Sequence, residues 1–124
     1  PSGWHVPSDA EWNQLEIELG MNSSDASVIG FRGTHGNLMK SQSDWNANGN
    51  GTNANGFNAF PTGYAGLGSS ISLYGLNLET YFMTSTEFSA EKAWDRNFDN
   101  ERDGVLRSYD IDKVALMACR CVED

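Results

Sequence analysis

The sequence predicts one α+β domain, with its helices first and its strands last. Three observations support this fold class. Residues 8–20 carry the signals of an amphipathic helix, residues 41–68 are rich in Asn and Gly, and short β-rich runs follow. A chain of 124 residues is large enough for one hydrophobic core but not for two, so we expect a single domain over residues 1–124. Its start at Pro1 is typical of a mature or excised fragment of a longer protein.

The first element is a helix with clear start and stop signals. Residues 8–11 have the Ser-x-x-Glu spacing of a capping box, which satisfies backbone N–H groups at a helix start. Trp12, Leu15 and Leu19 then recur on one helical face. Gly20 follows, and glycine commonly ends a helix. We therefore expect this helix to bury its apolar face in the core.

The next part of the chain is less regular. We expect a short second helix over residues 24–30 and irregular structure over residues 32–40, with a turn at 35–37. In residues 41–68 Asn and Gly interleave, and both tolerate left-handed backbone conformations. Long loops with apolar anchors are often functional. We expect one here, anchored to the core by Trp45, Phe57, Phe60 and Tyr64.

The remainder of the chain contains short β-rich runs separated by turn residues. Asp103-Gly104 is a hairpin turn signal between two of these runs. The last run closes the sheet. The expected strands are residues 70–76, 81–86, 93–98, 105–109 and 114–122, with the third and fourth forming the hairpin.

The charge of the chain excludes two classes of partner. The formal net charge is −9, with 17 acidic residues against 8 Lys and Arg. Nucleic acids and anionic membrane surfaces attract positive charge, and no apolar run approaches the roughly 20 residues that span a bilayer. We expect neither nucleic-acid binding nor membrane insertion. The acidity is compatible with calcium, with neutral sugars or with solubility alone.

The two cysteines, Cys119 and Cys121, lie two residues apart. On a strand their side chains project to the same face, so a bridge between them is strained. A partner outside this segment, or in a neighbouring chain, is geometrically easier. Two buried free thiols are the alternative.

The sequence does not predict an enzyme. His5 and His35 are the only histidines, and they lack metal-ligand spacing. Residues 85–87 are not in a nucleophile elbow, and Gly66-x-Gly68 lacks the third glycine of a phosphate-binding loop. We therefore expect a domain that binds and does not catalyse.

A set of short motifs runs along almost the whole chain. The opening motif is Gly-Trp-His-Val-Pro-Ser-Asp-Ala-Glu-Trp at residues 3–12. The later motifs are Asn50-Gly51-Thr52-Asn53, Gly56-Phe57, Pro61-x-Gly63-Tyr64, Tyr81-Phe82-x-x-Ser85-Thr86-Glu87, Ala93-Trp94-x-Arg96, Val105-x-Arg107 and Arg120-Cys121-Val122. In this order they resemble the Fibrobacter succinogenes major paralogous domain.

The resemblance implies a fold, a location and a disulfide. The family occurs in secreted and cell-surface proteins of Bacteroidota and related bacteria. Its fold resembles the C-type-lectin-like, formylglycine-generating-enzyme type, with two helices on small twisted antiparallel sheets and long loops. Members commonly carry a cysteine just before the opening motif, paired with the one that matches Cys121. This chain begins at Pro1, and Cys119 stands where a small residue such as Ser is usual, so partners outside this segment are implied for both cysteines.

The late hairpin is the first candidate ligand surface. Asp95, Asn97 and Asp99 share one face of the strand, by its two-residue period. The resemblance implies a ligand surface here, and the composition also resembles the diversified receptor proteins made by diversity-generating retroelements. A solvated hairpin without a ligand is the alternative. The predicted ligand-binding residues are Asp95, Asn97, Asp99, Asn100, Glu101, Arg102 and Tyr109.

Trp45 is the candidate for stacking on a sugar ring. It lies just before the Asn residues of the loop over residues 41–68, and an aromatic face suits a patch of axial C–H groups. We expect the other tryptophans, Trp4, Trp12 and Trp94, in the core. Core anchoring is the alternative for Trp45 as well.

A calcium site in the hairpin turn is a further candidate. Hard cations need several oxygen ligands at once, and one turn supplies them. The spacing of an EF-hand and the Glu-Pro-Asn motif of lectins are both missing. A solvated acidic turn is the alternative. The candidate ligands are Asp99, Asn100, Glu101 and Asp103.

These observations predict a non-catalytic, extracellular bacterial domain. We expect it to bind a glycan or a surface protein through the late hairpin and the Asn-rich loop. The alternative is a structural subunit of a surface fibre or adhesin that assembles with copies of itself, as Cys119 and Cys121 suggest. A diversified receptor-binding protein is the third interpretation.

Overall fold

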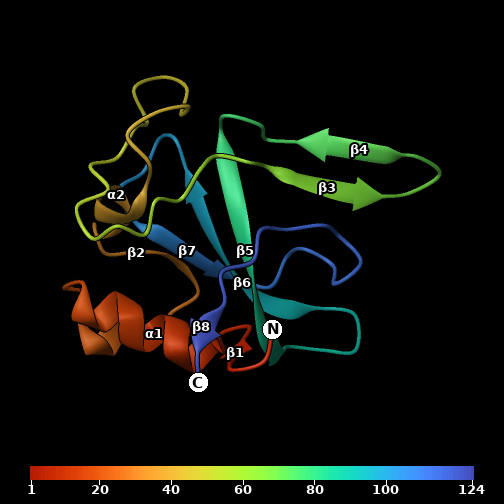
Figure 1. Ribbon diagram of the computed structural model, residues 1–124, viewed down its shortest axis with the longest axis horizontal. Helices are drawn as coiled ribbons and strands as arrows, with labels where there is room; N and C mark the ends of the chain where they lie inside the picture. The colour runs from red at the N-terminus through yellow and green to blue at the C-terminus, as the bar shows by residue number, and fades with distance from the viewer.

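A computed structural model describes residues 1–124. The chain forms a small, mostly-β domain with two helices and antiparallel sheets (Figure 1). Neither helix has the length and apolar character that crossing a membrane requires. In chain order the elements are β1 (Trp4–His5), α1 (Asp9–Glu18), a 3₁₀ turn (Ser23–Asp25), β2 (Gly30–Arg32), α2 (Gly36–Met39), β3 (Tyr64–Leu67), β4 (Ile71–Tyr74), β5 (Glu79–Glu87), β6 (Ala93–Asp99), β7 (Val105–Ser108) and β8 (Val122–Glu123).

The centre of the molecule is a four-stranded antiparallel sheet in the order β2-β7-β6-β5. The predicted late hairpin is confirmed as β6 and β7, with Asp95 opposite Ser108 and Asn97 opposite Leu106. Helix α1 lies beside this sheet near one end of β5 (Figure 1). The β3-β4 hairpin projects away from the body, and β1 pairs with β8.

The predicted first helix is confirmed as α1. The Ser8 hydroxyl accepts a hydrogen bond from Glu11 N, and the Glu11 carboxylate accepts one from Ser8 N at 2.8 Å. Gly20 follows the helix with φ of +103°, a conformation that glycine adopts without strain. The predicted apolar face packs on the core through Trp12, Leu15 and Leu19.

The core lies between α1, the central sheet and the long loop. The Trp12 ring lies 5.6 Å from that of Phe57, which in turn lies 5.4 Å from Phe82 of β5. Phe82 and Phe98 meet edge to face at 5.8 Å, an arrangement that aromatic rings favour. The buried core residues are Trp12, Met39, Trp45, Ala59, Phe82, Phe98 and Val105.

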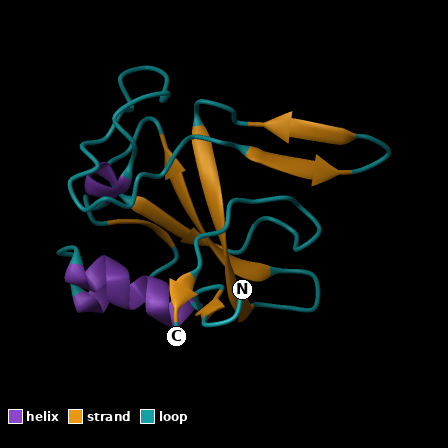
Figure 2. Ribbon diagram, viewed as in Figure 1, coloured by secondary structure: helices purple, strands orange, loops and turns teal.

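The loop of residues 41–63 contains no helix or strand (Figure 2). Backbone hydrogen bonds hold it in place. Ser41 N donates to Ala59 O at 2.9 Å, and Gly51 N donates to Ser41 O at 2.9 Å. The structured loop predicted over residues 41–68 is confirmed over residues 41–63, but Tyr64–Leu67 form strand β3. Phe60 is exposed and is not an anchor. The residues with positive φ that the loop accommodates include Asp44, Ala47, Asn48, Asn53 and Asn58.

The segment between α1 and the long loop differs from prediction. The helix expected over residues 24–30 is only a 3₁₀ turn, because Gly30 has φ of +117° and begins β2, which pairs with β7. Residues 36–39 form the short helix α2, where irregular structure is expected. Its Gly36 is buried, and a Cβ there would lie 2.7 Å from Asp103 O.

The closing strand predicted over residues 114–122 is wrong. Only Val122–Glu123 forms a strand, β8. Upstream, the backbone makes single bridges to two different neighbours, from Leu116 to Ala65 and from Ala118 to Phe82. A segment that changes partner after two residues cannot form a continuous ladder.

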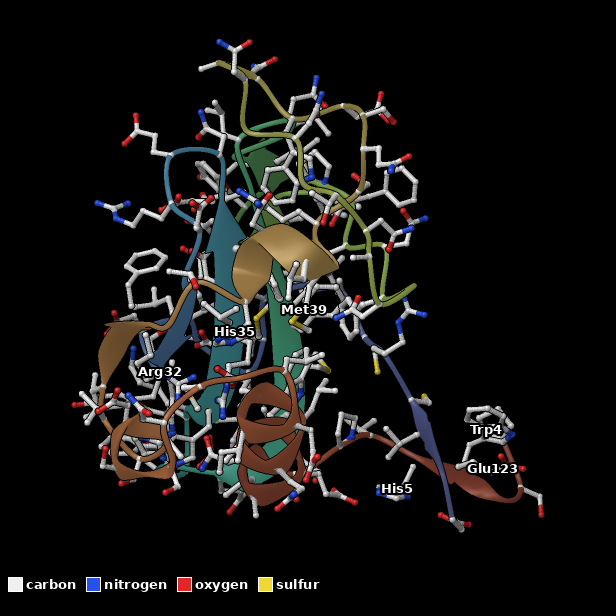
Figure 3. The ribbon with its side chains drawn as sticks, turned by 90° about the vertical axis from the view of Figure 1, so that its left-hand side faces the viewer. Trp4, His5, Arg32, His35, Met39 and Glu123 are labelled. Atoms are coloured by element: carbon white, nitrogen blue, oxygen red, sulfur yellow. The ribbon has the colours of Figure 1, made fainter.

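The β1-β8 pair brings the two ends of the chain together (Figure 3). Trp4 lies opposite Glu123 and is 47% exposed, so the prediction of a core position is wrong for this residue. The ring nitrogens of His5 contact the carboxylates of Asp124 and Glu11, each at 2.8 Å. The imidazole donates hydrogen bonds to these two carboxylates, which raises the pKa of His5.

Candidate functional site

The tip of the β6-β7 hairpin meets the Asn-rich loop. Asn100 N donates to Leu78 O at 2.8 Å, and the Asn100 side-chain amide lies 3.5 Å from Asn46 O. Gly49 packs so closely that a Cβ there would lie 2.5 Å from Asn100 O. The two segments predicted to bind ligand therefore lie side by side. We call their exposed residues the loop–turn surface: Asn46, Ala47, Asn48, Glu101, Arg102 and Asp103.

Lys40 holds the hairpin tip from the inside. It is 2% exposed, and its Nζ donates to Asp99 O at 3.1 Å and to Arg102 O at 3.0 Å. Burial lowers the pKa of Lys40, while Asp103 and Asp99 oppose the shift. The sequence does not reveal this role, because a lysine is rarely buried and nothing around Lys40 marks it as an exception.

The hairpin turn is closed by its own hydrogen bonds. Asp99 Oδ1 accepts from Glu101 N at 2.9 Å, and Oδ2 is paired with the Arg102 guanidinium. That guanidinium lies over the Phe31 ring at 4.5 Å. No group of three or more His, Cys, Asp or Glu side chains is placed to hold a metal ion. Asp99, Glu101 and Asp103 therefore do not form such a group. The calcium site proposed from Asp99, Asn100, Glu101 and Asp103 stays a prediction.

Asp95 and Asn97 do not belong to an exposed surface. They are 1% and 2% exposed, so the predicted exposed polar face is wrong for both. Asp95 Oδ1 accepts from the Ser108 hydroxyl at 2.7 Å, whereas Oδ2 is buried without a partner. The Asn97 amide donates to Thr80 O at 3.3 Å.

The cause of this burial is a second layer over the sheet. Tyr64 of β3 lies against Tyr81 of β5 with ring centroids 5.2 Å apart. Asp110 and Ile111, from the segment after β7, lie near Asp95. Burial raises the pKa of Asp95 to about 6, and the Ser108 hydrogen bond opposes the shift only in part.

Two aromatic residues predicted to bind ligand, Trp45 and Tyr109, are not part of the loop–turn surface. Trp45 is 5% exposed, and its Nε1 donates to Ser41 Oγ at 3.0 Å and to Ala59 O at 3.3 Å. It is a core anchor and is not available to a sugar ring. Tyr109 follows β7 at the end far from the turn, stacked on Phe88 with ring centroids 3.6 Å apart. It is therefore separate from the loop–turn surface.

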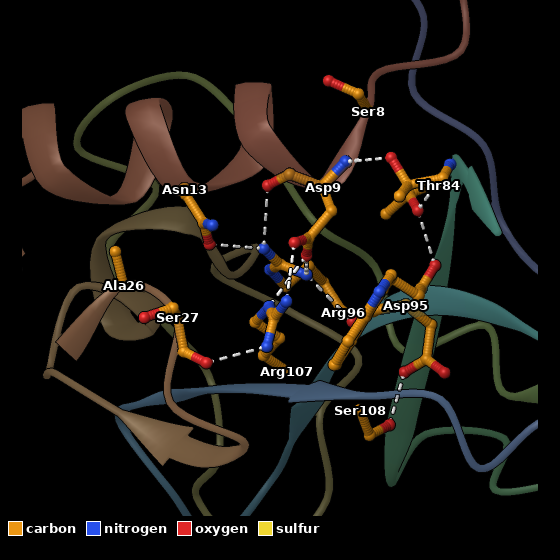
Figure 4. Close-up of polar contacts among 12 residues, drawn as sticks. Ser8, Asp9, Asn13, Ala26, Ser27, Thr84, Asp95, Arg96, Arg107 and Ser108 are labelled. Atoms are coloured by element: carbon orange, nitrogen blue, oxygen red, sulfur yellow. Dashed lines mark hydrogen bonds and ion pairs between the residues drawn. The ribbon is translucent and has the colours of Figure 1, made fainter. Parts of the chain in front are cut away.

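A buried ion network joins α1 to the sheet (Figure 4). Arg96 and Arg107 lie opposite each other on β6 and β7. Asp9 accepts from Arg96 Nη1 at 2.8 Å, and from Arg107 Nε at 2.9 Å and Nη2 at 2.7 Å. Burial acts to raise the pKa of Asp9, but the hydrogen bonds from Arg107 and Arg96 outweigh it and hold the pKa below its usual value.

Glu16 is the second acid of this network and is fully buried. It accepts two hydrogen bonds from Arg32 Nη2, at 2.9 and 2.7 Å, and is also paired with Arg96 and His35. The sequence contains a signal for this network. Asp9 and Glu16 lie seven residues apart, on the same helical face as the buried Trp12. Acids within an apolar face need cationic partners.

Both cysteines are free thiols. Cys119 is exposed and Cys121 is half-buried. Burial and the neighbouring Cys121 raise the pKa of the Cys119 thiol. Partners outside this segment remain a prediction.

Comparison with known proteins identifies the family. The family model of the Fibrobacter succinogenes major domain matches residues 1–123. No curated protein and no solved structure matches the chain. The matched range covers every helix and strand described above, because β8 ends at Glu123. The chain therefore belongs to the Fibrobacter succinogenes major domain family.

Proposed function

We propose that this domain binds a glycan outside the bacterial cell, without catalysing a reaction, through the loop–turn surface. The observation that carries the proposal is the contact of Asn100 with Asn46 and Gly49, which joins two segments far apart in sequence. A C-type-lectin-like fold is part of the proposal, supported by two helices beside twisted antiparallel sheets with a long ordered loop. The extracellular location is supported by the family resemblance.

The chemistry of this surface suits hydroxyl groups. Asn46 and Asn48 present exposed amides, each with donors and an acceptor, and Glu101 adds an exposed carboxylate. Lys40 and Gly49 already hold both segments in place. Binding to a preformed surface avoids the entropy loss of ordering a loop. A protein ligand is the alternative, since the same groups also suit a polar peptide surface.

Glycan and protein arrays probed with two variants test the proposal. Asn48 has φ of +63°, so Asn48→Gly removes the amide without straining the backbone. Glu101→Gln removes the charge and keeps the shape of the side chain. We expect each variant to bind about tenfold more weakly, which is the loss of one good hydrogen bond to the ligand.

Asn22→Ala is the matched control. Asn22 is exposed, lies on another part of the chain and makes no capping hydrogen bond. We expect the control to bind like the wild type. Equal binding by all three variants would remove the loop–turn surface as the site. Binding only on the protein array would replace the glycan with a protein ligand.

A further inference from the structure

The outer strand of the β3-β4 hairpin, β4, has one free edge (Figure 1). β4 pairs with β3 and with no other strand. The N–H and C=O groups of Ala65 both bond to Leu116, at 2.9 Å, on the side of β3 away from β4. Backbone groups of successive residues in a strand point to opposite sides, so Tyr64 and Gly66 direct theirs toward β4. Because Ala65 lies opposite Leu73, the N–H and C=O groups of Leu73 and Ile71 point outward from the free edge.

One face of this hairpin is apolar and exposed. Leu67 lies opposite Ile71, Ala65 lies opposite Leu73, and Leu116 is bonded alongside Ala65. Cross-strand partners share a face, so these side chains form one surface, the apolar hairpin face. Ile71 is 69% exposed and Leu73 58%, more than Leu67 at 48%. The greatest exposure is therefore on the edge strand.

The hairpin carries no charge. Residues 60–78 contain no Asp, Glu, Lys, Arg or His, whereas the whole chain has a net charge of −9. Two copies of an acidic chain repel each other least where both are neutral. Edge strands that must avoid pairing usually carry a lysine, a proline, an inward charge or a bulge. β4 carries none of these.

We propose that two copies of this chain pair through β4 in antiparallel orientation, with Ser72 on the two-fold axis. Ile71 then lies opposite Leu73 of the partner subunit, and Leu73 lies opposite Ile71 of the partner subunit. The outward backbone groups meet as hydrogen-bonded pairs, and the most exposed apolar side chains become cross-strand neighbours. Each hairpin thus becomes half of a four-stranded sheet, which is more stable than two strands alone.

The contact is self-complementary, which favours a second copy over another partner. A two-fold contact of this kind closes on itself and gives a dimer. The hairpin projects away from the loop–turn surface (Figure 1). The dimer therefore does not depend on the proposed ligand site.

Sedimentation of the wild type and two variants, up to about 1 mM chain, tests the pairing. Leu73→Pro removes an outward N–H, and edge strands tolerate proline at such a position. Leu116→Lys places a charge on the apolar hairpin face away from the edge. We expect a wild-type dimer, a Kd raised about tenfold or more by Leu73→Pro, and little change with Leu116→Lys. A wild type that stays monomeric overturns the proposal. The proposal is also overturned if the wild-type dimer is lost in Leu116→Lys but kept in Leu73→Pro.

A cross-linking variant tests the register without weakening the strand. In a background with Cys119→Ser and Cys121→Ser, Ser72→Cys places two thiols at a non-hydrogen-bonded pair, where Cβ atoms are about 4.5–5.5 Å apart. A mild added oxidant takes up the two electrons and two protons that the thiols release. We expect a disulfide-linked dimer from Ser72→Cys and not from Ser70→Cys, a control in the adjacent turn. Equal cross-linking of both, or of neither, overturns the register.

Discussion

Arg96 and Arg107 lie directly opposite each other on β6 and β7 and share one carboxylate, that of Asp9. Two buried guanidinium groups repel each other unless an acid lies between them. Asp9 is in the first turn of α1, where the helix dipole also favours a negative charge. The position of α1 on the sheet therefore depends on a buried ionic contact as well as on the apolar core.

Asp9→Asn removes this shared charge and leaves both guanidinium groups buried without it. Breaking a buried ion pair on one side typically costs about 3–5 kcal/mol. We expect a decrease of that order in the free energy of unfolding, measured by urea denaturation followed by circular dichroism. Asp112→Asn is the control, because Asp112 forms an exposed pair with Lys92 at 3.3 Å and such pairs contribute little. Similar losses in both variants would contradict this role of Asp9.

Asp95 makes the stability of the fold depend on pH. Its pKa is about 6 in the folded protein, against an ordinary value of 3.8. Between these values only the folded state holds the proton, so the contribution of Asp95 is greatest below 3.8 and is lost as the pH rises through about 6. One pKa unit corresponds to about 1.4 kcal/mol, so the loss is on the order of 3 kcal/mol.

We expect Asp95→Asn to remove the pH-dependent contribution of Asp95 to the free energy of unfolding. Relative to the wild type, the variant gains stability as the pH rises from about 3.5 to about 7. Urea denaturation of both proteins across this range measures the difference, in which the titration of all other groups cancels. Parallel curves for the two proteins would show that Asp95 does not titrate in this way.

Lys40→Met tests how the loop–turn surface is held. The substitution keeps an unbranched apolar chain but removes the ammonium that bonds to Asp99 O and Arg102 O. Each hydrogen bond to a charged group contributes about 1.5–3 kcal/mol. We expect faster amide exchange over residues 99–104, measured by hydrogen–deuterium exchange and mass spectrometry. Exchange in β3 serves as the internal control, and unchanged exchange in the turn would show that Lys40 does not hold it.

The parts of the fold that the sequence predicts well are those with local causes. The capping box at residues 8–11 and the Asp103-Gly104 turn act over a few residues, and the structure forms α1 and the β6-β7 hairpin there. The closing strand over residues 114–122 fails for the opposite reason. Its alternation of apolar residues is real, but its backbone bonds to separate partners on different strands.

In the candidate site too, the features with local causes are predicted from the sequence, and those that depend on distant residues are not. The sequence places the Asn-rich loop and the late hairpin as the two ligand segments, and the structure brings Asn46 and Asn100 together. Alternation along β6 correctly puts Asp95 and Asn97 on one face, opposite Arg96 and Phe98. It cannot tell which face meets solvent, because that depends on whether another layer covers it. Tyr64, which lies against Tyr81, and the residues Asp110 and Ile111 near Asp95 provide that layer.

The sequence by itself determined the family, the first helix, the hairpin and the ordered Asn-rich loop, because capping, turn formation and left-handed conformations depend on near neighbours. Only the tertiary structure decided which polar residues are buried. Asp9, Glu16, Lys40 and Asp95 are all buried, although charged side chains are usually exposed. Each is held by groups from distant elements, and the free energy of burying a charge depends on those partners.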